Sequence, residues 1–235
     1  MIRTTGIARV AIPVPDLDEA RMAWTRLGFA LGPRVREPAT GIAYESVLLK
    51  RGQLALTSGA LEIEIDAPGL DSGEDVLRQV ELPDRSLALH ERRRVIAPPA
   101  VLWREAAPSV PIQPEWLAHP NGAAALAGVL AVIDAPASAE AFERALGAGA
   151  VNTTDDTVTL RLGTQTVILA TAEDAGAMYP EADDFCAVVR VMVDDLPRAA
   201  DVLADWRIDF DEAGGRLVVP PDEASGVLLE LLGPR

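Results

Sequence analysis

Apolar and polar residues alternate at the start of the chain, and then the period changes. Residues 7 to 29 read IARVAIPVPDLDEARMAWTRLGF, an alternating run followed by an Asp-containing turn and an amphipathic stretch. Period-two alternation predicts a strand, and either Asp16 or Asp18 can cap the helix that follows. The apolar face of that helix recurs every three or four residues, at Ala20, Met22 or Ala23, Trp24 and Leu27.

The same strand–turn–helix pattern returns later in the chain. Residues 188 to 210 read VVRVMVDDLPRAADVLADWRIDF, with Asp194 or Asp195 as the helix cap. Residues 126 to 150 form another copy. The helix of residues 188 to 210 is expected to bury a stripe made of Leu196, Ala199, Ala200, Leu203 and Trp206.

A weaker copy spans residues 76–103 and predicts a short helix over residues 84 to 93. Extended segments such as YESVLLK, LEIEI, TVTLRL and GVLLELL follow the helices and predict strands. The Pro-rich stretch 107–125 is the expected linker, which gives an N-terminal domain over 1–110 and a C-terminal domain over 111–235. Each domain then holds two repeats that pair around a cleft, the kind of concave surface that ligands favour.

These repeats resemble the vicinal oxygen chelate superfamily, which includes glyoxalase I, bleomycin-resistance proteins, fosfomycin-resistance enzymes and extradiol dioxygenases. The resemblance rests on VAIPVPDLDEARMAWTRLGF with LEIEI, on PEWLAHPNGAAALAGVLAVID, and on VMVDDLPRAADVLADW with GVLLELL. It implies an α+β fold of four βαβββ units forming two paired, curved mixed sheets. Because this scaffold hosts lyases, isomerases, oxygenases and non-catalytic binders, it does not identify a reaction.

Metal-binding members of the superfamily place His or Gln on the first strand of a unit and Glu on its last strand. Carried over, Arg9 and Val188 occupy the first-strand positions of the first and fourth units, and Ala127 or Gly128 that of the third. The last-strand glutamates are matched by Glu62 and Glu230. No nitrogen ligand remains in this pattern, so we expect no cofactor; a divalent metal is not supported by the first-strand residues.

Strand alternation predicts which side chains face the first cleft. In IARVAIPV, Ala8, Val10, Ile12 and Val14 are expected under the helix. Arg9 would then face the cleft together with Glu62 and Glu64 of LEIEI. First and last strands of such a unit are expected to be neighbours, so Arg9 could form a bidentate pair with one of these carboxylates.

The fourth unit repeats this arrangement with Arg190 and Met192 on the first strand and Glu230 on the last. Each Arg–Glu pair is either a structural ion pair or a ligand-contacting group.

Four more residues are candidates for the site or for a purely structural role. Tyr44 either points into the first cleft or caps a sheet edge, and Trp103 either lines the cleft or lies in the core. His90 is either a base or a solvated helix residue, and His119 is expected to order a turn with Asn121 and Gly122.

Charge and composition limit the classes of molecule that the protein is expected to bind. The formal net charge is −15 at pH 7, which disfavours binding to nucleic acid or to an anionic membrane. The single cysteine, Cys186, lies in an apolar run and excludes a disulfide framework. No signal peptide or membrane span is expected, so the localisation we expect is cytoplasmic, and the chain could be a monomer or a homodimer.

Three functions remain open at this point. The first is a glyoxalase-like protein that binds a small organic molecule in a cleft without the usual metal triad. The second is an enzyme: a lyase or isomerase that uses Arg9 or Arg190 to stabilise an enolate-like anion while a glutamate moves a proton, or a metal-dependent enzyme with atypical ligands. The third is a scaffold whose clefts have closed.

Overall fold

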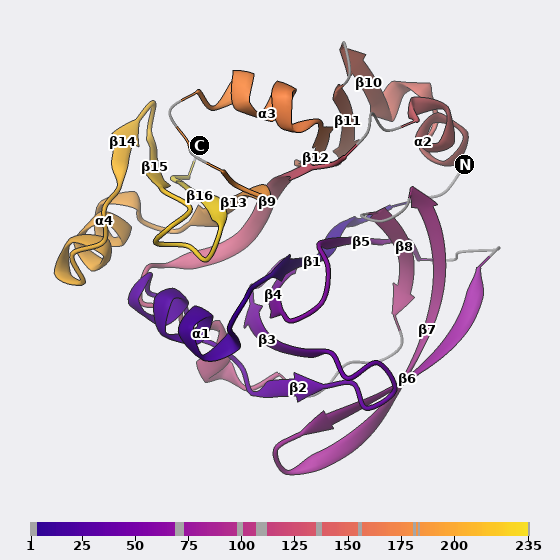
Figure 1. The fold of residues 1–235 in the computed structure, drawn as a ribbon, viewed down its shortest axis with the longest axis horizontal. Coiled ribbons are helices and arrows are strands. Elements are labelled where there is room, and N and C mark those ends of the chain that lie inside the picture. The colour runs from indigo at the N-terminus through magenta and orange to yellow at the C-terminus, as the bar shows by residue number, and fades with distance from the viewer. Residues whose placement is uncertain are drawn as a thin grey trace.

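The computed structural model describes residues 4–68, 73–97, 101–106, 112–134, 138–154, 157–180, 182 and 184–234. For residues 90, 97 and 101–106 it describes the main chain alone. Two mixed β-sheets make up most of the structure, and the helices lie around them (Figure 1).

The first half of the chain folds into a closed barrel. Its strands are β1 (Gly6–Pro13), β2 (Arg34–Arg36), β3 (Ala43–Leu48), β4 (Gln53–Thr57), β5 (Glu62–Asp66), β6 (Glu74–Leu82), β7 (Arg85–Ala97) and β8 (Val101–Ala106). Their order around the barrel is β1-β4-β3-β2-β6-β7-β8-β5. β1 pairs with β4 and β5 with β8 in parallel, so β1–β4 and β5–β8 are two repeats, joined by the antiparallel β1–β5 pair.

The second half forms an open sheet of eight strands in the order β10-β11-β12-β9-β13-β16-β15-β14. These strands are β9 (Ala123–Val132), β10 (Val151–Thr154), β11 (Thr157–Leu162), β12 (Gln165–Ala170), β13 (Ala187–Val193), β14 (Asp211–Ala213), β15 (Arg216–Val219) and β16 (Val227–Leu232). The same logic recurs: β9 pairs with β12 and β13 with β16 in parallel, while β9 and β13 join the two repeats.

In the parts of the chain that the structure describes, helices complete three of the four repeats. They are α1 (Leu17–Arg26), α2 (Ala139–Leu146) and α4 (Leu196–Asp205), and α3 (Ala172–Met178) connects the third repeat to the fourth. Short 3-10 turns lie at Pro114–Leu117 and Ala148–Ala150. None of the helices in the described parts of the chain has the length and apolar character that spanning a bilayer would require.

Asp16 begins α1, where its carboxylate accepts hydrogen bonds from two main-chain N–H groups of the first turn. Asp195 begins α4, where its carboxylate accepts one hydrogen bond, from Arg198 N. α1 buries Ala20 and Trp24, whereas Met22 is 62% exposed. Of the alternatives in the sequence, Ala23 therefore lies on the buried side. Trp206 is 53% exposed, which contradicts its predicted burial, because the helix ends before it and the chain turns away.

The main core lies between the outside of the barrel and the second sheet. Polar contacts fix this packing: Gln165 accepts a hydrogen bond from Ile7 N and donates one to Leu126 O, both at 2.7 Å. His119 closes a turn with Gly122, as expected, and also joins the halves through its ring. Its Nδ1 accepts from Ala30 N at 2.9 Å, and its Nε2 donates to Leu48 O at 2.8 Å.

Several sequence-based expectations were wrong in this region. The helix predicted over residues 84 to 93 is part of the long strand β7, since its residues pair with β6 on one side and β8 on the other. LEIEI is not the last strand of the first repeat but β5, the first strand of the second. A register shift between Ile7 and Arg9 places Ile7, rather than Ala8, in the core.

Candidate functional site

Charged side chains converge inside the barrel. Arg9 Nη2 lies 3.0 Å from Glu62 Oε1 and 2.8 Å from Glu64 Oε1. The Arg9 guanidinium is also 5.4 Å from the centre of the Tyr44 ring on β3. The antiparallel register of β1 and β5 sets Arg9 opposite Glu64 and Ala11 opposite Glu62, so both carboxylates share the face of Arg9.

Two further arginines extend this group across the barrel. Arg78 of β6 pairs with Glu37 and lies 3.4 Å from Glu91. Arg93 of β7 contacts Glu64 at 3.0 Å and Glu91 at 2.8 Å. We call this group the barrel cluster; it consists of Arg9, Glu37, Tyr44, Glu62, Glu64, Arg78, Glu91 and Arg93.

Five of the eight residues of the barrel cluster are buried, the other three are partly buried, and their charges largely offset each other. Glu64 has no exposed surface, and Arg9 is 8% exposed. Burial acts to lower the pKa of Arg9, but the attraction of Glu64 and Glu62 outweighs it, so the pKa is raised and the guanidinium stays charged. Burial also raises the pKa of Tyr44, which stays a neutral phenol. Each arginine of the cluster is held by at least one carboxylate of the same barrel.

A second polar group lies on the concave face of the open sheet. Glu230 of β16 is fully buried, and its Oε2 accepts from Arg190 Nε at 2.8 Å. Its Oε1 lies 3.1 Å from Arg216 Nη1 and accepts from Tyr179 Oη at 3.2 Å. Tyr179 Oη in turn accepts from Arg190 Nη2 at 2.7 Å. We call these four residues the Glu230 cluster.

The pKa values of Tyr179 and Arg190 are both raised above their ordinary values. Burial, the largest influence, raises the pKa of Tyr179, with Arg190 acting against it and Glu230 adding to it. The Tyr179 hydroxyl therefore keeps its proton at neutral pH. The pKa of Arg190 is raised despite its burial, because Tyr179 and Glu230 favour the charged form.

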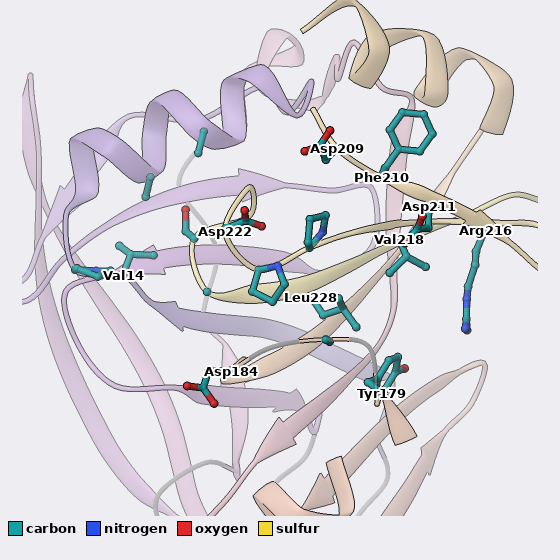
Figure 2. A pocket seen from close by; sticks show the side chains of 18 of the residues that line it. Val14, Tyr179, Asp184, Asp209, Phe210, Asp211, Arg216, Val218, Asp222 and Leu228 are labelled. Carbon is teal, nitrogen blue, oxygen red and sulfur yellow. The ribbon is translucent and has the colours of Figure 1, made fainter. Parts of the chain in front are cut away.

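A cavity of about 1140 Å³ opens beside the Glu230 cluster, and we call it the α1–β16 cavity. Figure 2 shows side chains from the start of α1, from the segment after α3 and from β14–β16 turned toward it. Tyr179 and Arg216 belong both to the cavity wall and to the Glu230 cluster. The apolar part of the wall includes Val14, Ala20, Tyr179, Phe210, Val218 and Leu228.

The residues of the open sheet do not fit a divalent metal. Gly128, Arg190 and Glu230 lie side by side on β9, β13 and β16, so two of three positions in this row carry no ligand atom of the required kind. A Cβ on Gly128 would lie 2.6 Å from Thr166 O, so a side chain there needs a main-chain shift. Among the described residues, no group of three His, Cys, Asp or Glu side chains is placed to hold a metal ion.

The structure brings six of the predicted site residues into two groups. Arg9, Tyr44, Glu62 and Glu64 meet in the barrel, and Arg190 meets Glu230 on the open sheet. The side chains of His90 and Trp103 lie outside the described part of the chain. In the main chain, His90 belongs to β7 and pairs with Leu77, and Trp103 belongs to β8 and pairs with Ile65.

Sequence reasoning missed several members of both groups. In the barrel these are Glu37, Arg78, Glu91 and Arg93. The alternation of EDVLRQVEL could have placed Arg78 on the inner face with Val80, since both are buried. For Tyr179 no such signal exists, because it follows the short helix α3 and reaches the cluster only through the tertiary fold.

Comparison with known proteins finds similar folds but no similar sequences. No protein-family model and no curated protein matches the chain. Among solved structures, a triple mutant of 4-hydroxymandelate synthase from Streptomyces coelicolor is similar, with a TM-score of 0.56 and 11% identity, over 99% of this chain and 93% of that one. A hypothetical protein from Staphylococcus aureus gives a TM-score of 0.58 at 7% identity, over 97% and 99% of the two chains.

A xylose isomerase-like TIM barrel/4-hydroxyphenylpyruvate dioxygenase fusion protein also matches, with a TM-score of 0.52 and 11% identity. The match covers 99% of this chain but 49% of the fusion protein, so the present chain corresponds to about half of its length. At these identities the likeness concerns the fold alone. The chain has the α+β architecture of two curved mixed sheets expected from the sequence, and its structural neighbours include enzymes with the vicinal oxygen chelate fold.

Proposed function

We propose that this protein binds a small organic molecule in the α1–β16 cavity and does so without a metal triad. The observation that carries the proposal is the cavity of about 1140 Å³, whose wall combines apolar side chains with two members of the Glu230 cluster. Ligand sites in proteins are typically concave and largely apolar, with a few polar groups that fix orientation.

The barrel is the poorer candidate for a ligand site. Its inward-facing arginines are already paired with carboxylates, and replacing such a pair by a ligand would expose an uncompensated buried charge. The expected role of Arg9, Glu62 and Glu64 is therefore structural. Arg190 and Glu230 would act behind the cavity wall, where they hold Tyr179 and Arg216 in place.

The test is a ligand-observed NMR screen of small aromatic and aliphatic fragments against the chain and a cavity-filling variant, Val218→Trp. Val218 lines the cavity on β15, so a larger side chain there should displace bound fragments. Thr159→Trp is the matched control, since Thr159 is a half-buried strand residue on β11 away from the cavity. Fragments that bind Val218→Trp as well as they bind the unchanged chain would show that the cavity is not the site.

A second candidate is an enzyme of the lyase or isomerase class, and the position of Tyr179 favours it. Tyr179 lines the cavity, and its hydroxyl donates a hydrogen bond to Glu230 and accepts one from Arg190. A tyrosine held in this way can deliver a proton to a substrate. If a substrate panel reveals turnover, Tyr179→Phe should lower it at least about 100-fold; unchanged turnover would eliminate this candidate.

A further inference from the structure

Carboxylates dominate the charge around the α1–β16 cavity. Figure 2 shows Asp184, Asp209 and Asp222 placed around it. The acidic residues that line it are Asp16, Glu19, Asp184, Asp209, Asp211 and Asp222, and all of them are exposed. We call this set the acidic rim. A ligand in the cavity therefore meets exposed carboxylates of the wall.

The positive charge available to balance the rim is small. Arg216 is the one basic residue of the described cavity wall, and Glu230 already holds its guanidinium at 3.1 Å. No ion pair between the rim and a basic side chain occurs in the described part of the chain. Asp16 is bound to main-chain N–H groups at the start of α1, and these hydrogen bonds lower the pKa of its carboxyl, so it stays charged.

The inner wall adds a second element of selectivity. Tyr179 and Phe210 present aromatic rings, and Val218 and Leu228 present aliphatic surface. Aromatic faces attract organic cations by about 0.5–2 kcal/mol, and apolar walls favour a ligand with a hydrophobic body. A cavity of this size has room for more than one ring.

From these observations we infer that the ligand class is an organic cation, an amine or guanidine attached to an apolar, ring-containing body. This inference rests on the proposed function, since it names the chemistry of the molecule that occupies the same cavity. The body lies against Phe210, Val218 and Leu228, and the cationic group lies at the acidic rim. Because the rim is exposed to water, it selects by charge and contributes modestly to affinity.

Three matched probes separate charge from shape: naphthylmethylamine, naphthylmethanol and naphthylacetate, titrated by their own fluorescence. The amine should bind at least about fivefold more tightly than the alcohol, the equivalent of about 1 kcal/mol, and the acetate should bind most weakly. In about 1 M NaCl, where the Debye length falls to about 3 Å, the gap between amine and alcohol should shrink.

The variants test the rim directly. The double substitution Asp209→Asn with Asp211→Asn removes two rim charges and should weaken the amine about fivefold while the alcohol is unaffected. The control pair, Asp201→Asn with Asp205→Asn, removes the same charge from exposed positions on α4 outside the cavity and should change neither.

The outcomes distinguish the two levels of the proposal. If the alcohol or the acetate binds as tightly as the amine, and Val218→Trp displaces it, the cavity is the ligand site and the cation inference is overturned. If none of the probes binds, or if Val218→Trp leaves their binding unchanged, the proposed function itself is wrong and the cation inference falls with it.

Discussion

Glu64 and Glu230 are fully buried carboxylates, and each is held by more than one arginine. Glu64 receives Arg9 at 2.8 Å and Arg93 at 3.0 Å, and Glu230 receives Arg190 and Arg216. A buried carboxylate is tolerated when its charge is paired and hydrogen-bonded, and the loss of one partner leaves the other charge uncompensated. A single substitution in either cluster should therefore lower the free energy of unfolding.

The first prediction at this scale concerns Glu64→Gln, which leaves Arg9 and Arg93 short of a negative charge inside the barrel. The free energy of unfolding should fall by about 3–5 kcal/mol in urea denaturation. Glu62→Gln is the matched control: the Glu62 side chain is 28% exposed, so its loss should cost about 1 kcal/mol or less. Equal costs for the two variants would show that the burial of Glu64 does not decide its contribution to stability.

The second prediction concerns pH and His119. Burial, the main cause, lowers the pKa of this ring in the folded protein below its ordinary value of 6.5, and Nδ1 must stay unprotonated to accept from Ala30 N. The unfolded chain thus binds a proton at a higher pH than the folded chain does. The contribution of the neutral His119 ring to the free energy of unfolding is complete above about pH 6.5 and is lost as the pH falls below that value.

Urea unfolding between about pH 5 and pH 8 checks this dependence. The unchanged protein should lose stability on the acid side, and His119→Gln, which has no titrating ring, should lose less over the same interval. Because carboxylates titrate in both proteins, the difference between the two curves isolates the histidine. Parallel curves would show that His119 does not titrate with folding.

At the scale of elements, the contact between the two halves depends on close main-chain approach. Gly52, in the turn before β4, has φ +88°, and a Cβ there would lie 2.8 Å from Leu126 Cδ1 and 3.1 Å from Ile7 O. The neighbouring Arg51 forms a bridge with Ala125 of β9. A side chain at Gly52 would therefore displace the Leu126 side chain of the open sheet and press on the Ile7 carbonyl of β1.

Gly52→Ala should lower the free energy of unfolding by about 2–5 kcal/mol, about 1–2 from the left-handed main chain and the rest from the clash. Gly163→Ala separates the two effects, because Gly163 has φ +65° and a Cβ added there would meet no atom within 4 Å. Gly163→Ala should therefore lose only the contribution of the left-handed main chain, about 1–2 kcal/mol. Equal losses in denaturation experiments would contradict a tight contact between the halves.

Alternation along single strands predicted side-chain faces well where the strand is regular. Ile63 and Ile65 are buried in the core with Glu62 and Glu64 on the opposite face, and Arg190 shares the concave face with Glu230. The pairing of strands was harder to predict, since β5 carries the same pattern whether it ends one repeat or begins the next. LALHERRR contains good helix formers, and its partners β6 and β8 make it a strand.

At the scale of the whole molecule, the two halves use one repeat plan in different ways. The first closes into a barrel through a pair between β2 and β6, and its charged side chains meet inside. The second stays open, and its concave face borders the α1–β16 cavity. The sequence does not predict this difference, because both halves carry an Arg–Glu pair on their inner strands. Closure of the first half depends on pairing between strands that lie far apart in the chain.

The measurement that tests the central proposal most directly is a titration of the isotope-labelled protein with naphthylmethylamine, followed by amide chemical shifts. Binding in the α1–β16 cavity predicts shifts at Tyr179, Phe210, Val218 and Leu228, with the amides of Arg9 and Glu64 unmoved. Shifts confined to β1, β5 and the other strands of the barrel, with the cavity amides unchanged, would contradict it.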